Sequence, residues 1–268
     1  TTDHELRHLA VARRVAAEGI VNVTTSLLGA HAVPPEHADD RAGYVREVVE
    51  RMIPEAAARE LADACDVYLD EGAFTHHEAA EILGAAVEAG LAVRAHVGQF
   101  ADLEGAELAA ELGALSADHL EAVSDAGLEA MARTGVTAVL LPGAWRTLRQ
   151  AAPDAERMRR FGVRIAVGTD CNPGTSPTVD LPLMASLAVR DAGLTLEEAV
   201  LAITRRAARA AGIPGVGRIR VGFRADLALY DEEDPRALAY SIGGLLARTV
   251  VLGGALVTDE PPSTSALW

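Results

Sequence analysis

Three side chains that can bind a metal ion or move a proton stand where apolar segments of this sequence end. His96, His119 and Asp170 close the segments LAVRAH, ALSADH and VRIAVGTD. Imidazole and carboxylate groups are ligands that suit Zn²⁺ and non-haem iron. Taken singly, His96 also fits a hydrogen-bonded core histidine, His119 a helix cap or strand-end packing residue, and Asp170 an N-cap or turn acid. Their recurrence at equivalent ends of one repeated unit favours a metal site.

The elements that position these residues alternate between strands and helices. Short apolar, β-branched runs predict six strands, at Ile20–Ala30, Cys65–Asp70, Leu91–His96, Ala114–His119, Val136–Gly143 and Val163–Asp170. Helical spacing lies between them, at Arg41–Ala62, His76–Ala89, Ala106–Glu111 and Ala122–Arg133. Nearly continuous apolar strands alternating with helices indicate an α/β fold whose parallel sheet is covered on its outer side. In a (β/α)8 barrel the carboxyl ends of the strands meet at one face, so we expect one shared pocket.

A closed barrel of this type has eight strands, so six strands predict an incomplete barrel. The sequence opens in an amphipathic helical pattern without an initiating Met, which also favours a fragment or trimmed chain. The segments after Asp170 change in pattern and predict two helices and two β segments, at Leu181–Ala192, Leu196–Ala211, Gly217–Asp231 and Arg248–Val257. The Gly-Gly pair in the last segment predicts a hairpin turn. We expect a catalytic barrel domain over 1–212 and a β-rich segment over 213–268.

Composition limits the function further. The chain has 268 residues, 50% of them hydrophobic, and a net charge of -15, which argues against binding to nucleic acid or to an anionic membrane surface. Cys65 and Cys171 form neither a metal motif nor a disulfide framework, so we expect a reducing, cytoplasmic setting, with Cys171 in a packing role. No apolar run approaches the roughly 18 residues that a membrane span needs, and we expect no signal peptide.

The loop after Asp170 is rich in small polar residues. Asn-Pro-Gly and Ser-Pro within residues 172–177 are strong turn signals. A loop of this kind that opens a helix near Leu181 can also offer backbone amides to an anion. The two interpretations are compatible, and we expect both to hold.

Several motifs in this chain resemble one enzyme family. The segments LGAHAVPPE, HVGQF, GALSADHLE, LLPGAW and GTDCNPGTSPT are similar to those of the imidazolonepropionase family, within the metal-dependent amidohydrolase superfamily. The similarity continues through GRIRVGFRADLALYD and so covers nearly the whole chain. It implies a (β/α)8 TIM-type barrel of the amidohydrolase kind, here strands three to eight, with the C-terminal part of a small β-sandwich. It also implies hydrolysis of 4-imidazolone-5-propanoate to N-formimidoyl-L-glutamate in histidine degradation.

The resemblance also implies roles for particular residues. One metal ion, Zn²⁺ or Fe³⁺, would be bound by His96 and Asp170. The catalytic residues would be His119 and Asp170. The substrate contacts would be His31, Gln99, Asn172, Gly174 and Thr175, the last three holding the propanoate tail.

Two departures from the family pattern keep alternatives open. The chain has no His-x-His pair, which supplies two metal ligands in the family, and Gly98 stands where the family usually has an acid. The alternatives are a truncated, catalytically silent scaffold, or an amidohydrolase or deaminase acting on another cyclic amide. We expect a small-molecule partner with a carboxylate tail. An exposed sheet edge or a large β unit would favour a homodimer.

Overall fold

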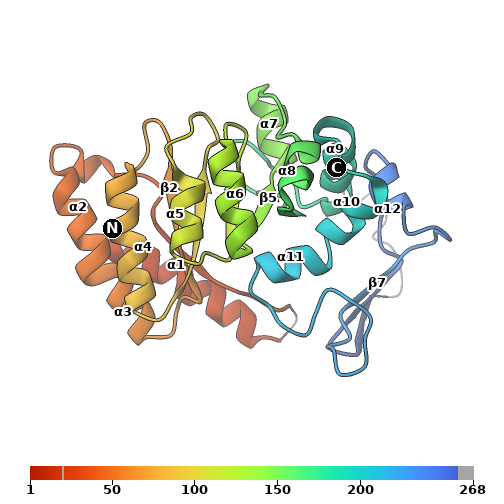
Figure 1. Ribbon diagram of the computed structural model, residues 1–268. Coiled ribbons are helices and arrows are strands. Elements are labelled where there is room, and N and C mark those ends of the chain that lie inside the picture. Colours follow the sequence, from red (N-terminus) through yellow and green to blue (C-terminus); the bar gives the residue numbers. More distant parts are fainter. Residues whose placement is uncertain (20, 259–268) are drawn as a thin grey trace. The chain divides into compact units, whose positions relative to one another are not determined.

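The computed structural model describes residues 1–19 and 21–258. They form two compact units, which are described separately (Figure 1). The first comprises residues 1–140 and 156–165, and the second residues 141–155 and 166 onwards. The expected boundary between residues 212 and 213 stays a prediction.

A six-stranded sheet in the order β1-β2-β3-β4-β5-β6 confirms the α/β class and corresponds to part of a (β/α)8 barrel. Its strands are β1 (Ser26–Ala30), β2 (Ala64–Leu69), β3 (Ala92–Val97), β4 (Ser116–His119), β5 (Thr137–Leu140) and β6 (Arg164–Val167). The pairings from β1 to β5 are parallel. Each expected strand is present, although the first begins only at Ser26, and Ile20 lies outside the described residues. The fifth ends at Leu140 because Pro142 starts a helix.

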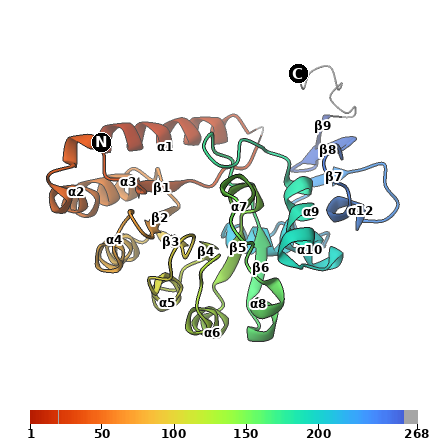
Figure 2. The same ribbon diagram turned by 90° about the horizontal axis from the view of Figure 1, so that it is seen from above.

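Helices cover the outer face of the sheet in the first unit (Figure 2). They are α4 (His76–Glu88), α5 (Gly105–Glu111) and α6 (Asp125–Thr134), with α8 (Ala155–Phe161) before β6. Buried side chains of these helices, such as Ile82, Leu108 and Met131, pack on this side of the unit. The amphipathic opening pattern forms α1 (Thr2–Ala17), which contacts β1.

The two faces of the sheet differ in chemistry. Along β3, Val93, Ala95 and Val97 are buried, whereas Arg94 and His96 are only half-buried and point to the opposite face. The expected continuous apolar runs therefore carry a polar residue at alternate positions, as strand geometry allows. One face supports the helices, and the other presents the polar side chains from which the site is built.

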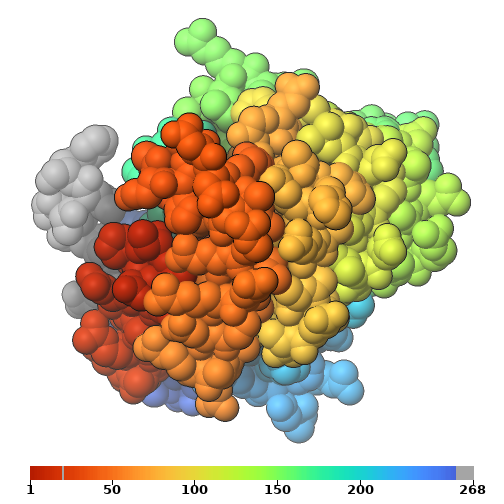
Figure 3. All heavy atoms as spheres, turned by 90° about the vertical axis from the view of Figure 1, so that its left-hand side faces the viewer, coloured from red at the N-terminus to blue at the C-terminus, as the bar shows by residue number. Residues whose placement is uncertain are grey.

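The expected single helix over Arg41–Ala62 is divided into three parts. They are α2 (Arg41–Glu47), a π-helical turn η2 (Val48–Met52) and α3 (Ile53–Ala58). Pro54 has no N–H to donate and its ring crowds the preceding turn, which explains the widening. The segments from α1 to α4 lie side by side on the surface shown in Figure 3.

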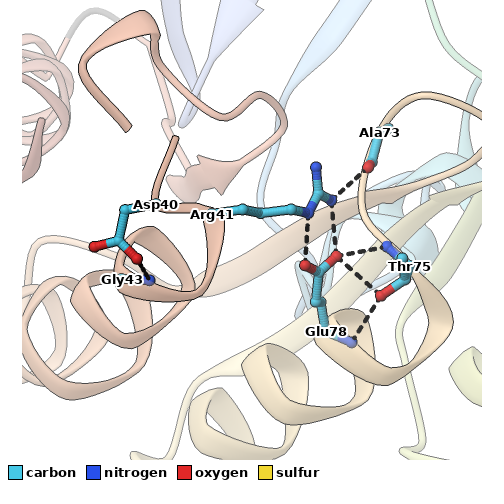
Figure 4. Close-up of polar contacts among 6 residues, drawn as sticks. All are labelled: Asp40, Arg41, Gly43, Ala73, Thr75 and Glu78. Atoms are coloured by element: carbon cyan, nitrogen blue, oxygen red, sulfur yellow. Dashed lines mark hydrogen bonds and ion pairs between the residues drawn. The ribbon is translucent and has the colours of Figure 1, made fainter. Parts of the chain in front are cut away.

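A network of polar contacts joins α2 to α4 (Figure 4). Arg41 donates from Nε and Nη2 to the two carboxylate oxygens of Glu78, at 2.6 and 2.7 Å, and from Nη2 to the carbonyl of Ala73. Glu78 and Thr75 also form the capping box of α4. Glu78 thus fixes the start of α4 and the side chain of Arg41 together.

The second unit combines helices with a small antiparallel sheet. Its elements are α7 (Pro142–Leu148), α9 (Leu181–Ala192), α10 (Leu196–Ala202), α11 (Arg205–Ala210), β7 (Leu227–Leu229), α12 (Ala237–Tyr240), β8 (Thr249–Leu252) and β9 (Ala255–Thr258). Gly253 and Gly254, both at positive φ, form the expected hairpin turn.

Two of the elements predicted for this unit are longer than the observed ones. Only Leu227–Leu229 of the expected strand Gly217–Asp231 is extended, because Gly217 and Gly222 adopt positive φ and turn the chain. The second expected helix is interrupted near Thr204, where φ is -121° and ψ is -101°. None of the described helices is long and apolar enough to span a membrane.

Candidate active site

The sheet register brings polar residues of neighbouring strands side by side. His96 on β3 pairs with Tyr68 on β2 and with Asp118 on β4. Asp66, two residues before Tyr68, points to the same face because side chains alternate along a strand. The face below the strand ends therefore carries an imidazole, a phenol and two carboxyl groups.

Asp66 lies against two imidazole rings. Its Oδ1 is 2.9 Å from His96 Nδ1 and 3.5 Å from His31 Nε2. One potential ligand atom from each of these three residues lies within 4.8 Å of the others, so the cluster is a possible metal site. His31 Nε2 is buried without a hydrogen-bond partner, which suits an additional ligand. Imidazole and carboxylate are ligand types that suit Zn²⁺ or iron, and Asp66 can act here either as a ligand or as a hydrogen-bond partner of a ligating ring.

Burial of the Asp66 carboxyl favours its neutral form and on its own would raise its pKa. The nearby rings of His96 and His31 act in the opposite direction through electrostatic attraction, with His96 contributing most. Their combined effect holds the pKa of Asp66 below its ordinary value. The side chain is therefore a buried carboxylate with imidazole partners.

His119 joins the same group. The ring centroids of His119 and His96 lie 5.5 Å apart. The ring centroids of His31 and His96 lie 4.7 Å apart in a T-shaped contact. His119 and Leu120 both have positive φ, 78° and 73°, which is uncommon for residues other than glycine and costs free energy. The buried Glu121 carboxylate lies 3.7 Å from His119 Nδ1. Two strained residues thus place a buried imidazole beside a buried acid.

Gln99 is positioned by both its backbone and its side chain. The carboxylate of buried Asp70 accepts the backbone N–H groups of Gln99, Phe100 and Ala101 at 2.6 to 3.0 Å. The Tyr68 hydroxyl donates to Gln99 Oε1 at 2.8 Å. Burial, followed by the nearby acids, raises the pKa of Tyr68 to about 12, so this phenol remains protonated and able to donate. Gln99 is thereby fixed at the end of β3.

An open cavity of about 320 Å³ adjoins these residues. Its lining includes His31, Tyr68, Arg41 and Glu71. A space of this size can admit a small organic molecule. His31 is the histidine among its lining residues, so a ligand within the cavity would contact His31.

Asp170 belongs to the second unit and has a positive φ of 49°. The loop that follows is closed on Asn172. The Oδ1 of Asn172 accepts the N–H groups of Gly174 and Thr175, both at 2.8 Å, while its Nδ2 donates to the carbonyl of Asp170. The amides expected to hold an anion thus have an internal partner. The roles of Asp170, Asn172, Gly174 and Thr175 stay predictions, and Cys171 is exposed rather than packed.

The structure therefore gathers His31, His96, His119 and Gln99 of the predicted residues. Their roles in metal binding, catalysis and substrate contact stay predictions. Sequence reasoning missed Asp66, Asp70 and Glu121, which support them. A signal for Asp66 was available, because an acid within an apolar strand needs a buried partner. Gly98 carries no side chain that could contact His96, whereas Asp66 lies 2.9 Å from its Nδ1 atom.

Comparison with known proteins identifies the family to which this chain belongs. A family model described as "Amidohydrolase family" matches residues 9–258. The chain belongs to the amidohydrolase family. Among curated amidohydrolase relatives, the imidazolonepropionase of Paracoccus denitrificans is 47% identical over 95% of this chain and 64% of its own length. That of Geobacillus thermodenitrificans is 46% identical over 96% and 61%. The chain thus spans less than two thirds of these relatives.

Solved structures agree on the fold of this amidohydrolase. A zinc-bound adenosine deaminase from Xanthomonas campestris has a TM-score of 0.74 at 20% identity, over 97% of this chain and 66% of its own. N-isopropylammelide isopropylaminohydrolase from Burkholderia multivorans has a TM-score of 0.72 at 23% identity, over 96% and 68%. These similarities support the barrel-type architecture.

Proposed function

We propose that this amidohydrolase hydrolyses the ring amide of 4-imidazolone-5-propanoate to give N-formimidoyl-L-glutamate, a step in histidine degradation. The observation that carries the proposal is the convergence of His31, His96 and His119, of which His31 lines a cavity, in a chain 43–47% identical to imidazolonepropionases. The substrate is a small molecule with a carboxylate tail. A cytoplasmic location and a homodimer belong to the same proposal.

The residues proposed to hold one Zn²⁺ or Fe³⁺ ion are His96 and Asp170. When bound, such an ion supplies hydroxide near neutral pH by lowering the pKa of its water. His119 donates a hydrogen bond to the attacking oxygen or to the oxyanion that develops, a contact whose loss costs about 3–4 kcal/mol. Asp170 accepts the proton of the water and passes it to the departing ring nitrogen.

The residues proposed to contact the substrate are His31, Gln99, Asn172, Gly174 and Thr175. The Tyr68 hydroxyl donates a hydrogen bond to Gln99 Oε1. The amide NH₂ of Gln99 is therefore the group that donates to an acceptor on the substrate. In the substrate complex, a carboxylate must replace Asn172 Oδ1 as partner of the Gly174 and Thr175 amides. This orientation sets the ring for attack.

The direct test is metal analysis of the purified protein together with an assay of imidazolone hydrolysis. We expect near-stoichiometric Zn or Fe and turnover, and loss of both in Asp170→Asn. The sequence contains no His-x-His pair, which favours a second candidate, a catalytically silent scaffold. Absence of metal and of turnover would support that candidate. Turnover of a different cyclic amide or of a deaminase substrate, but not of the imidazolone, would refute the substrate assignment.

A further inference from the structure

We propose that Asp66 is a positioning residue that orients His96 for metal binding through the Nε2 atom of the imidazole. The inference rests on the proposed function only in assigning a metal ion to His96. It assigns to Asp66 the task of holding the Nδ1 proton of that ring. Asp66 is then a partner of the ligand and not itself a ligand.

The separation of the two atoms supports this distinction. His96 Nδ1 and Asp66 Oδ1 lie 2.9 Å apart, the usual distance of a charge-assisted N–H···O hydrogen bond. Two unprotonated atoms at this distance would direct lone pairs at each other. Because a carboxylate can only accept, Nδ1 carries the proton, so in the neutral ring that binds a metal ion the lone pair is on Nε2.

The location of Asp66 makes it suitable for this task. It lies within β2, and its side chain is only 4% exposed. A strand restricts the movement of its side chains more than a loop does, so the carboxylate can fix the plane of the ring. A carboxylate that accepts the second ring N–H is the common support of metal-binding histidines. The same Oδ1 lies 3.5 Å from His31 Nε2, so one acid sits between both rings.

The first test compares Asp66→Asn with the wild-type protein by Co²⁺ and Zn²⁺ titration against a chelator. We expect affinity to fall about 10- to 100-fold, with one equivalent still bound at saturation and an unchanged Co²⁺ absorption spectrum. Asp63→Asn is the matched control, because Asp63 precedes the same strand and pairs with Arg13. It should leave affinity within about threefold. Unchanged affinity in Asp66→Asn, or loss of the saturable equivalent with a changed spectrum, would overturn the proposal; the latter would make Asp66 a ligand.

A second measurement needs no variant. The ¹⁵N chemical shifts of the His96 ring in the zinc-loaded protein should show a protonated Nδ1 and a metal-bound Nε2. A metal-bound Nδ1 would contradict the positioning role. Both experiments are done without substrate, so failure to hydrolyse the imidazolone would refute the proposed function and leave the assignment of Asp66 intact.

Discussion

At the level of single residues, buried carboxylates lie beside the residues of the candidate site. Asp66 contacts His96, Glu121 faces His119, and Asp70 accepts backbone N–H groups. Burying a carboxylate is costly unless hydrogen bonds or charges compensate. Each acid is therefore informative, because its partner is a residue or loop whose position the proposed chemistry needs.

Asp70→Ala should destabilise the protein by about 2–4 kcal/mol. The substitution removes the acceptor for the N–H groups of residues 71, 99, 100 and 101, and a buried donor left unsatisfied costs about 1–3 kcal/mol. Urea denaturation measures the loss, and faster amide exchange at Gln99 and Phe100 locates it. Glu71→Ala, at the neighbouring exposed position, is the control and should stay within about 0.5 kcal/mol of wild type. Equal stability of the two variants would show that the Asp70 contacts contribute nothing.

The sequence was sufficient to locate His96 and His119 at the ends of strands, but not to identify the residues that contact their rings. A histidine that closes a strand can be located by counting elements, because parallel strands end at one edge. The partner of that histidine depends on the register between strands, which places Asp66 beside a ring thirty positions later. The closure of the Asn172 loop on its own amides likewise depends on local geometry that turn signals do not specify.

At the level of elements, short contacts between helices and loops fix where the strand ends lie. The split of the segment after Arg41 into α2, η2 and α3 brings Met52 and Val48 against Gly29 of β1. Helical periodicity predicted this segment as one helix, because the spacing of apolar residues does not show that Pro54 interrupts the regular hydrogen bonding. The bidentate contact of Arg41 with Glu78 is another link that no local pattern reveals.

Glu78→Gln should remove a pH-dependent contribution to stability. The hydrogen bond from Arg41, with smaller contributions from Thr75, lowers the pKa of Glu78 from 4.5 to about 2. The contribution is therefore present above about pH 4.5 and is lost as the pH falls towards 2. Because Arg41 is partly exposed, we expect about 1 kcal/mol at pH 7. Urea denaturation at pH 7 and pH 3 measures the difference between wild type and variant, which should shrink on acidification.

Glutamine can replace glutamate in a capping box, so the substitution chiefly tests the contact with Arg41. Glu198→Gln, in the capping box of α10 with Thr195, is the matched control and should change stability less. A difference between wild type and Glu78→Gln that is constant from pH 7 to pH 3 would argue against the ion pair.

Gly143→Ala should disturb the loop that carries Asp170. A Cβ at Gly143 would collide with the side chain of Ser176, whose Oγ donates to the carbonyl of Thr169 at 2.5 Å. Displacing Ser176 breaks that bond, so we expect a lower Tm and reduced turnover. Gly84→Ala, in α4 with open space around the added methyl group, is the control and should be neutral or stabilising by up to about 1 kcal/mol. Full activity and an unchanged Tm in Gly143→Ala would refute the constraint.

At the level of the whole molecule, the polar face of the sheet and the loop after Asp170 belong to different compact units. The strand count, the alternation with helices and the barrel class followed from the sequence, because they depend on periodicity and connection order. The division of the chain into two compact units depends on packing, which periodicity does not encode. Net charge is also a property of the whole molecule, and it attracts or repels any charged ligand that approaches.

Raising the ionic strength should lower the KM for the proposed anionic substrate. The net charge of -15 repels a carboxylate over a Debye length of about 30 Å at 0.01 M salt, whereas at 0.15 M that length is about 8 Å. Steady-state kinetics at these two salt concentrations should give a roughly two- to threefold lower KM at the higher one, with kcat unchanged. The propanamide analogue, which lacks the charge, should show no such dependence. A KM that rises with salt for the carboxylate alone would mean that local positive charge, and not the net charge of the chain, governs substrate approach.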